Sequence, residues 1–302
     1  MKSKSAQLKD LRARETARVA TIFLAPVFLI MCIFIFYPII SSFITSTYDW
    51  NGISANKKFT GFANWARLLK DTSFWLAFKN NVIIMVLSIV IQLPLGLALA
   101  TFLDFGEKLR AVKLYKVLWF VPLLMSSVAI GFLFSYALAT NGGMVSAISN
   151  MFGGGNIDLL GNPKTALLTV IAVICWQFTP FYMVYFIAAY TNIPYDVYEA
   201  SIIDGATRGQ YFFKIAFPLI FPFMRTAAIM SMVGSLKYFD LIYVMTGGGP
   251  GTSTELMATY MYKQSFRNFS MGYGSAVACG MFILISIIAL ITMNLINRSQ
   301  EA

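Results

Sequence analysis

The sequence contains no histidine, few charged residues and only three cysteines, and each shortage excludes a class of function. Without histidine the chain lacks the commonest general base and metal ligand, and it cannot form a histidine-dependent catalytic triad. Cys32, Cys175 and Cys279 lie far apart in apolar segments, so they offer neither a disulfide framework nor the CxxC spacing of a metal site. Charged residues form only 12% of the chain, against about 25% in a typical soluble domain. We therefore expect no metal site and no soluble enzyme.

Hydrophobic residues dominate the composition instead. They form 58% of the 302 residues, more than a globule of this length can bury, so much of the surface must face lipid. The net charge of +10 comes largely from basic clusters beside apolar runs, which is typical of the cytoplasmic edges of membrane helices. These clusters predict a lipid bilayer and no nucleic acid as the partner. The clustered residues are Lys2, Lys4, Lys9, Arg12, Arg14, Arg18, Lys108, Arg110, Lys113 and Lys116.

Six apolar segments are long enough to cross a bilayer, which takes about 20 residues of helix. They predict an all-α membrane protein, a polytopic bundle of six transmembrane helices within residues 19–296. A basic segment of residues 1–18 precedes the bundle and a short tail of residues 297–302 follows it. The expected spans are about 19–40, 82–103, 117–138, 165–190, 219–245 and 275–296.

The distribution of lysine and arginine predicts that both termini are cytoplasmic, because most basic residues then fall on the inner side. The polar loop of residues 191–217 is cytoplasmic in this orientation. Residues 41–81 and 139–164 are outer loops, the second one flexible. The aromatic residues of the first outer loop indicate short interfacial helices, which would either sit at the lipid headgroups or dock an external partner.

The inner loop has the pattern of a short helix, a bend and a second short helix. Pro194 suits a helix start, and Asp196 and Glu199 favour a helix N-terminus through the helix dipole. Gly205 interrupts the pattern and permits a bend or a close backbone approach. An ordinary amphipathic surface helix would explain the same pattern.

The run EASIIDGATRGQYFFKIAFP resembles the EAA signature of ABC-importer permeases. Glu199, Ala200 and Gly205 match that signature, whereas Ser201 replaces its second alanine and Phe217 replaces a leucine. GFANWARLL, FWLAFKNN, PLGLALA and FDLIYVMTGGGPGTST are similar to the carbohydrate-uptake branch, which is maltose- and oligosaccharide-transporter-like. The resemblance covers almost the whole chain.

The resemblance implies a type I importer permease whose inner loop is a coupling helix. That helix would insert into a cleft of a cytoplasmic ATPase and transmit its closure to the membrane helices. The implied coupling residues are Glu199, Ala200, Ser201, Asp204, Gly205, Ala206 and Pro218. The resemblance also implies a second, homologous permease forming a heterodimer, two copies of the ATPase and an external sugar-binding protein, at a bacterial or archaeal cytoplasmic membrane.

No nucleotide-binding motif is recognisable in the sequence. The glycine-rich run GGGPGTST of residues 247–254 is not followed by Gly-Lys-Ser/Thr, so it is not a Walker A loop. We therefore expect that the chain is not an enzyme, that it holds no cofactor, and that the partner ATPase binds ATP and Mg.

Charged residues within the fifth expected span mark a candidate substrate pathway, because charges inside a bilayer are expensive. Lys237 and Asp240 are one helical turn apart, so they are expected to share a face and could pair, either in the pathway or as a structural ion pair. Tyr238 and Tyr243 would supply the rings and hydroxyls that sugars need. Weaker candidates in the fourth span are Trp176, Gln177 and Tyr182.

These observations favour the permease subunit of an ATP-driven sugar or oligosaccharide importer. A glycerol-phosphate or other polyol importer of the same family is an alternative, because an anionic ligand would also require a basic residue in the pathway. A secondary transporter is less favoured, since inverted repeats are not recognisable. A membrane scaffold or receptor would have no need of charges inside a span.

Overall fold

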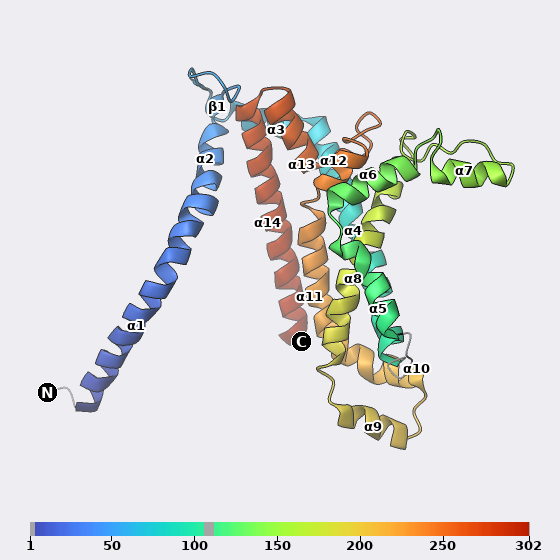
Figure 1. The fold of residues 1–302 in the computed structure, drawn as a ribbon. Coiled ribbons are helices and arrows are strands. Elements are labelled where there is room, and N and C mark those ends of the chain that lie inside the picture. Colours follow the sequence, from blue (N-terminus) through green and yellow to red (C-terminus); the bar gives the residue numbers. More distant parts are fainter. Residues whose placement is uncertain (1–3, 106–111, 302) are drawn as a thin grey trace. The chain divides into compact units, whose positions relative to one another are not determined.

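The computed structural model describes residues 4–105 and 112–301 of the chain, and most of these residues are helical (Figure 1). Lys2, Lys108 and Arg110, on which the orientation prediction partly depends, lie outside the described residues. The helices are α1 Lys4–Met31, α2 Tyr37–Thr45, α3 Ala63–Lys70, α4 Thr72–Phe105, α5 Val112–Leu124, α6 Ser127–Ala137, α7 Met144–Met151, α8 Ala166–Tyr190, α9 Tyr195–Ile203, α10 Arg208–Tyr211, α11 Phe217–Ser235, α12 Asp240–Met245, α13 Met257–Tyr262 and α14 Met271–Glu301. Single π-helical turns occur at Cys32–Phe36, Phe212–Ala216 and Lys263–Arg267.

The chain divides into two compact units. Unit 1 contains α1, α2, α3 and the segment Gln264–Cys279 with the first residues of α14. Unit 2 contains Lys70–Lys263, with α4 to α13, and the rest of α14 from Gly280 onward. All of the candidate coupling and pathway residues belong to unit 2.

Unit 1 begins with the basic first turns of α1, and the stretch Glu15–Thr45 that follows is long and apolar enough to cross a membrane. A two-stranded antiparallel sheet follows α2 and pairs β1 Tyr48–Asp49 with β2 Lys58–Phe59. Helix α3 is the short helix expected within residues 41–81. Asn64 on α3 donates hydrogen bonds to the backbone oxygens of Ser46 and Tyr48, each at 2.9 Å, and so ties α3 to the end of α2.

Unit 2 is built on close packing between α4 and α8. Gly96 makes the close approach possible, because a Cβ at this position would lie 2.8 Å from Cβ of Tyr182 and 3.0 Å from the backbone nitrogen of Met183. Around this contact, apolar side chains of α4, α8 and α11 form one buried cluster. The cluster includes Leu93, Leu97, Ala100, Tyr182, Phe186, Tyr190, Ile220 and Ala227.

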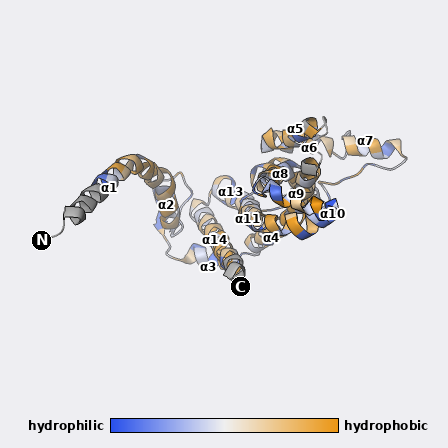
Figure 2. Cartoon of the chain, turned by 90° about the horizontal axis from the view of Figure 1, so that it is seen from below, coloured by the Kyte–Doolittle hydropathy of each residue, from blue (hydrophilic) through white to orange (hydrophobic). Residues whose placement is uncertain are grey.

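Five helical segments of the described residues are long and apolar enough to cross a membrane, and a sixth span results if one bent pair counts as a single crossing. The expected helical membrane bundle is confirmed, with five or six apolar spans where six were expected. Hydrophobic residues run along most helices of unit 2 (Figure 2), and large apolar side chains such as Phe102, Leu118 and Phe282 are exposed. Exposed apolar side chains on long helices are expected where the surroundings are lipid.

Two of the expected spans are not continuous helices, and the prediction that they are is wrong. The span expected at 117–138 consists of α5 and α6, which meet at an angle of 94°. Pro122 removes a backbone donor just before the bend, and Ser126 has the extended conformation of a helix N-cap. The span expected at 219–245 ends at Ser235, and α12 begins only at Asp240.

The second helices of these two broken spans, α6 and α12, pack against each other. Gly131 of α6 lies so close to α12 that a Cβ at this position would be 2.9 Å from Cβ of Val244. Ile130 is fully buried in the same cluster as Leu241 and Ile242. Helices α6, α12 and α13 lie at one end of unit 2, whereas α9 and α10 lie at the opposite end, where α4 ends and α5 begins (Figure 1).

Candidate coupling and transport sites

The predicted short helix, bend and second short helix of the inner loop are confirmed as α9, Gly205 and α10. Pro194 is the N-cap of α9, one residue earlier than the first helical position expected for it, and Asp196 lies in the first turn. At the other end the backbone N–H of Gly205 donates to the oxygen of Ile202, and that of Ala206 donates to the oxygen of Ser201. These two bonds form a Schellman motif, which ends the helix sharply.

Gly205 provides the backbone conformation that this motif needs. Its φ of +75° lies in the left-handed region, which side chains other than glycine adopt only with strain. Immediately afterwards, Thr207 and Gln210 form a capping box that starts α10, with the backbone N–H of Thr207 donating to Oε1 of Gln210 at 2.8 Å. The bend is therefore specified by hydrogen bonds on both sides.

One face of α9 is exposed and rich in apolar side chains. Ile203 is 84% exposed, Tyr195 67% and Ile202 54%. The candidate residues Glu199, Ala200, Asp204, Gly205 and Pro218 are exposed, and Ala206 is half-buried. Ser201 is buried, and its hydroxyl donates to the backbone oxygen of Tyr198 at 2.6 Å. Ser201, which replaces the second alanine of the EAA signature, is therefore buried within the loop and does not belong to its exposed face.

The buried face of α9 is connected to the membrane spans through aromatic side chains. The ring of Tyr198 packs edge-on against that of Tyr211 of α10, with ring centroids 5.0 Å apart. Tyr211 is buried in the cluster that also contains Tyr190, Phe186 and Ile220 of α8 and α11. A displacement of α9 would therefore be transmitted through this packing to α8 and α11.

The expected pathway residues lie in and beside the break between α11 and α12. Lys237 and Tyr238 are in the non-helical segment, Asp240 is the first residue of α12, and Tyr243 follows within α12. The expectation that Lys237 and Asp240 share a helical face is wrong, because the helix ends before both of them. Within the described residues no ion pair joins them.

Buried polar side chains surround this break. Ser88 and Gln92 of α4 and Ser231 and Ser235 of α11 are all buried, and Tyr182 of α8 lies near Ser231. Among the described residues the hydroxyl of Ser88 has no hydrogen-bond partner, whereas the hydroxyls of Ser231 and Ser235 lie near those of Tyr182 and Tyr238. Unpaired buried polar groups in an apolar bundle are costly and are candidates for contact with a polar ligand.

The sequence pattern did not lead us to Ser88, Gln92, Ser231 and Ser235, although their spacing indicates two polar helix faces. Ser88 and Gln92 are four residues apart on α4, and Ser231 and Ser235 are four apart on α11. In a helix that spacing places two side chains on one face. Each pair is thus a polar stripe within an otherwise apolar span.

Two neighbouring residues of α8 contact the two broken spans. Gln177 donates through Nε2 to the hydroxyl of Ser127 at the start of α6, at 3.0 Å, and its Oε1 has no partner. Phe178 packs against Tyr238 with ring centroids 5.5 Å apart. The structure therefore brings Gln177 and Tyr238 into one region around α8.

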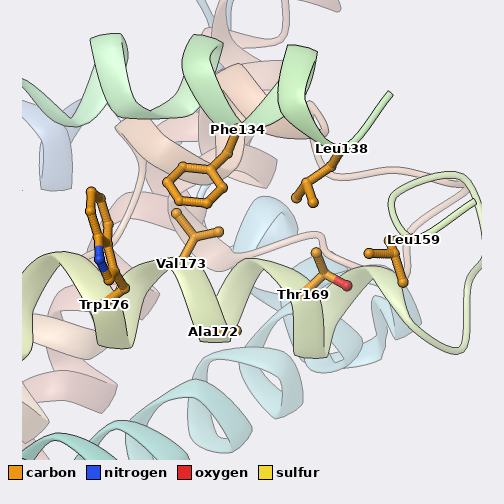
Figure 3. Close-up of a pocket in the computed structure, with 7 residues that line it drawn as sticks. All are labelled: Phe134, Leu138, Leu159, Thr169, Ala172, Val173 and Trp176. Atoms are coloured by element: carbon orange, nitrogen blue, oxygen red, sulfur yellow. The ribbon is translucent and has the colours of Figure 1, made fainter. Parts of the chain in front are cut away.

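Trp176 lies apart from that polar region. It borders an apolar cavity of about 380 Å³ between α6 and α8, where it lies opposite Phe134 of α6 and beside Val173 and Thr169 of its own helix (Figure 3). A second apolar cavity of about 370 Å³ on its other side is bounded by α4, α5 and α8. Both cavities expose few polar groups, so a role of Trp176 in holding a sugar gains no support from its surroundings.

The sequence and the fold agree with those of known transport proteins. Residues 92–301 match the family described as "Binding-protein-dependent transport system inner membrane component". The chain is 32% identical over 273 residues to the lactose transport system permease protein LacF of Rhizobium radiobacter, covering 89% of this chain and 90% of LacF. It is 31% identical over 280 residues to the trehalose/maltose transport system permease protein MalF of Thermococcus litoralis, covering 91% and 92% of the two chains.

Solved structures show the same fold. A chain of a bacterial ABC transporter involved in the import of the acidic polysaccharide alginate aligns with a TM-score of 0.82 at 21% identity, over 96% of this chain and 99% of that one. Family, relatives and fold thus agree over nearly the whole length. The chain belongs to the family of binding-protein-dependent transport system inner membrane components, and it is a multi-pass permease of the ABC importer type.

Proposed function

We propose that this chain is the permease subunit of an importer for a sugar or oligosaccharide, with α9 and α10 as the coupling element for a separate ATPase. The observation that carries the proposal is the capped helix α9, whose exposed apolar face lies at one end of the spans and whose buried face packs into them. The names of LacF and MalF support a carbohydrate as the substrate.

The coupling step is proposed to depend on contact between α9 and the ATPase and on rigid packing between α9 and the spans. Tyr195, Ile202 and Ile203 would be buried in the ATPase cleft, and burial of apolar surface favours association. Glu199 would pair with a basic group or a helix N-terminus of the ATPase. Because Tyr198 and Tyr211 connect α9 to the spans, movement of the ATPase would tilt them between inward-facing and outward-facing states.

The pathway is proposed to run past the break between α11 and α12. Tyr238 would contribute a ring and a hydroxyl, and the buried hydroxyls of Ser231 and Ser235, which lie near those of Tyr182 and Tyr238, would bind sugar hydroxyl groups. Tyr182, Gln177, Asp240 and Tyr243 belong to the same proposed pathway.

The proposed assembly contains further subunits. A second, homologous permease would complete a heterodimer, two copies of the ATPase would bind below it, and an external sugar-binding protein would deliver the substrate. The ATPase subunits would bind ATP and Mg, and this chain would hold no cofactor and catalyse no reaction. The membrane is the cytoplasmic membrane of a bacterium or an archaeon.

A second candidate substrate is an anionic polyol such as glycerol phosphate. The observation that favours it is Lys237, which is exposed in the break and has no ion-pair partner among the described residues. Lys237→Gln distinguishes the two, because it should abolish uptake of an anionic substrate and leave a neutral sugar close to the wild-type rate.

The proposal is tested by reconstituting the chain with its partner permease and ATPase in vesicles. The expected result is uptake of labelled lactose, maltose or trehalose that requires both ATP and the binding protein. Uptake that persists without the ATPase would contradict it, because a secondary transporter would remain active. Failure of the detergent-purified chain to retain a soluble ATPase in a pull-down would count equally against it.

A further inference from the structure

Two consecutive asparagines near the start of α4 bind different segments of unit 2. Asn81 is fully buried, and Asn80 is 5% exposed. The side-chain amide of Asn81 donates to the backbone oxygens of Ser235 at 3.4 Å and Leu236 at 3.3 Å, while its Oδ1 accepts from the backbone N–H of Met257 at 2.9 Å. One side chain therefore contacts the end of α11 and the start of α13.

The groups bound by Asn81 are those that broken helices leave without a partner. The last carbonyls of α11 and the first N–H of α13 cannot be satisfied within their own helices. In an apolar bundle each would be costly if left unpaired. Asparagine carries both a donor and an acceptor on a short side chain, so one residue satisfies both ends.

Asn80 serves the outer loop instead. Its amide donates to the backbone oxygens of Ser253 at 3.2 Å and Glu255 at 2.9 Å. Glu255 is buried and forms an ion pair with Lys263, and it also accepts from the hydroxyl of Thr259 at 2.6 Å. The two asparagines thus hold separate segments, as expected for neighbouring helix residues that point in different directions.

We infer that Asn81 is a positioning residue for substrate passage, which holds the break after Ser235 open so that Lys237 and Tyr238 stay in the pathway. The inference rests on the proposed function of that break. Asn80 holds the loop of residues 247–255 and is the matched control, because it is the same residue type at the adjacent position of the same helix.

The test compares Asn81→Ala with Asn80→Ala in the full complex reconstituted in vesicles. Uptake of labelled lactose, maltose or trehalose, whichever the wild type accumulates, is divided by ATP hydrolysed in the same vesicles. A purely structural defect lowers both quantities together and leaves their ratio unchanged. Asn81→Ala should lower the ratio about fivefold or more, whereas Asn80→Ala should leave it within about twofold.

Hydrogen–deuterium exchange of the same complexes reports on the break without any substrate. In Asn81→Ala the amides of residues 236–240 should exchange about tenfold faster, whereas those of 252–255 should not change. Asn81→Asp keeps the acceptor for Met257 and loses the donor, so it should accelerate exchange in 236–240 with less effect at 257. It also provides a second variant if the alanine variant fails to assemble.

An unchanged transport ratio together with unchanged exchange in 236–240 would overturn the inference. So would faster exchange with a wild-type ratio, because the break would then be loosened without consequence. Tyr238→Ala in the same assay distinguishes failure of the positioning role of Asn81 from failure of the proposed pathway. If it is impaired and Asn81→Ala is not, only the positioning role fails, and if neither is impaired the proposed pathway fails with it.

Discussion

Replacement of Gly205 by valine should uncouple the transporter, and the structure allows the size of the effect to be worked out. At a φ of +75° a residue other than glycine costs about 1–2 kcal/mol, and a β-branched side chain is at the unfavourable end. Apart from its two neighbours in sequence, no described residue has an atom within 4 Å of a Cβ built at this position, so the cost inside the chain is one of backbone conformation. A change of this size lowers the population of the correctly bent loop about 5- to 30-fold.

The assay is ATP hydrolysis stimulated by loaded binding protein in reconstituted vesicles. Gly205→Val should lose most of the stimulation while the binding protein still docks, because that protein acts on the opposite face of the membrane. Gly205→Asn tolerates the left-handed conformation. Near-normal stimulation in Gly205→Asn would therefore indicate that backbone strain causes the loss in Gly205→Val. Loss of stimulation in both variants would indicate that the added side chain clashes with the ATPase cleft. Gly209→Ala, in α10 with open space and ordinary φ, is the control. Full stimulation and uptake by Gly205→Val would refute the coupling role.

Three further predictions concern the same assembly. Glu199→Ala removes one charged contact and leaves the backbone of the bend unchanged, whereas Gly205→Val strains that backbone and also places a larger side chain where the ATPase would bind. Glu199→Ala should therefore reduce stimulated hydrolysis less than Gly205→Val does, and a larger loss would contradict the ranking. Tyr238→Ala and Asp240→Asn should slow uptake and leave co-purification with the ATPase intact, and wild-type uptake at normal expression would remove both residues from the pathway. Gly96→Leu should lower the stability of the purified protein by about 1–3 kcal/mol or more in thermal unfolding, because α4 and α8 must separate, whereas Gly234→Leu, which has open space, should have little effect.

The sequence was sufficient for the bundle and for the helix, bend and second helix of residues 195–211, because both depend on local patterns. Apolar runs of more than about 20 residues identify spans without knowledge of their packing. The bend after α9 was predictable because glycine is the residue that a left-handed position requires, and it was found at Gly205.

The two broken spans could not be predicted from hydropathy. Residues 117–138 contain no charged side chain and 219–245 contain only Arg225, Lys237 and Asp240, so both have the hydropathy of a single span, and hydropathy does not record helix direction. The break after Ser235 is accompanied by hydrogen bonds from Asn81, a residue more than 150 positions away in the sequence. A tertiary contact of this kind leaves no local signal, so the helical pairing of Lys237 with Asp240 was wrong.

The contact between Gly131 and Val244 has a consequence for how this sequence can change over time. With 2.9 Å between a Cβ at position 131 and Val244, any residue larger than glycine at 131 requires a smaller one at 244. Neither substitution is neutral alone, since the first overpacks the contact and the second leaves a cavity. The two positions should therefore covary among homologous sequences, and that covariation would reflect the contact between α6 and α12.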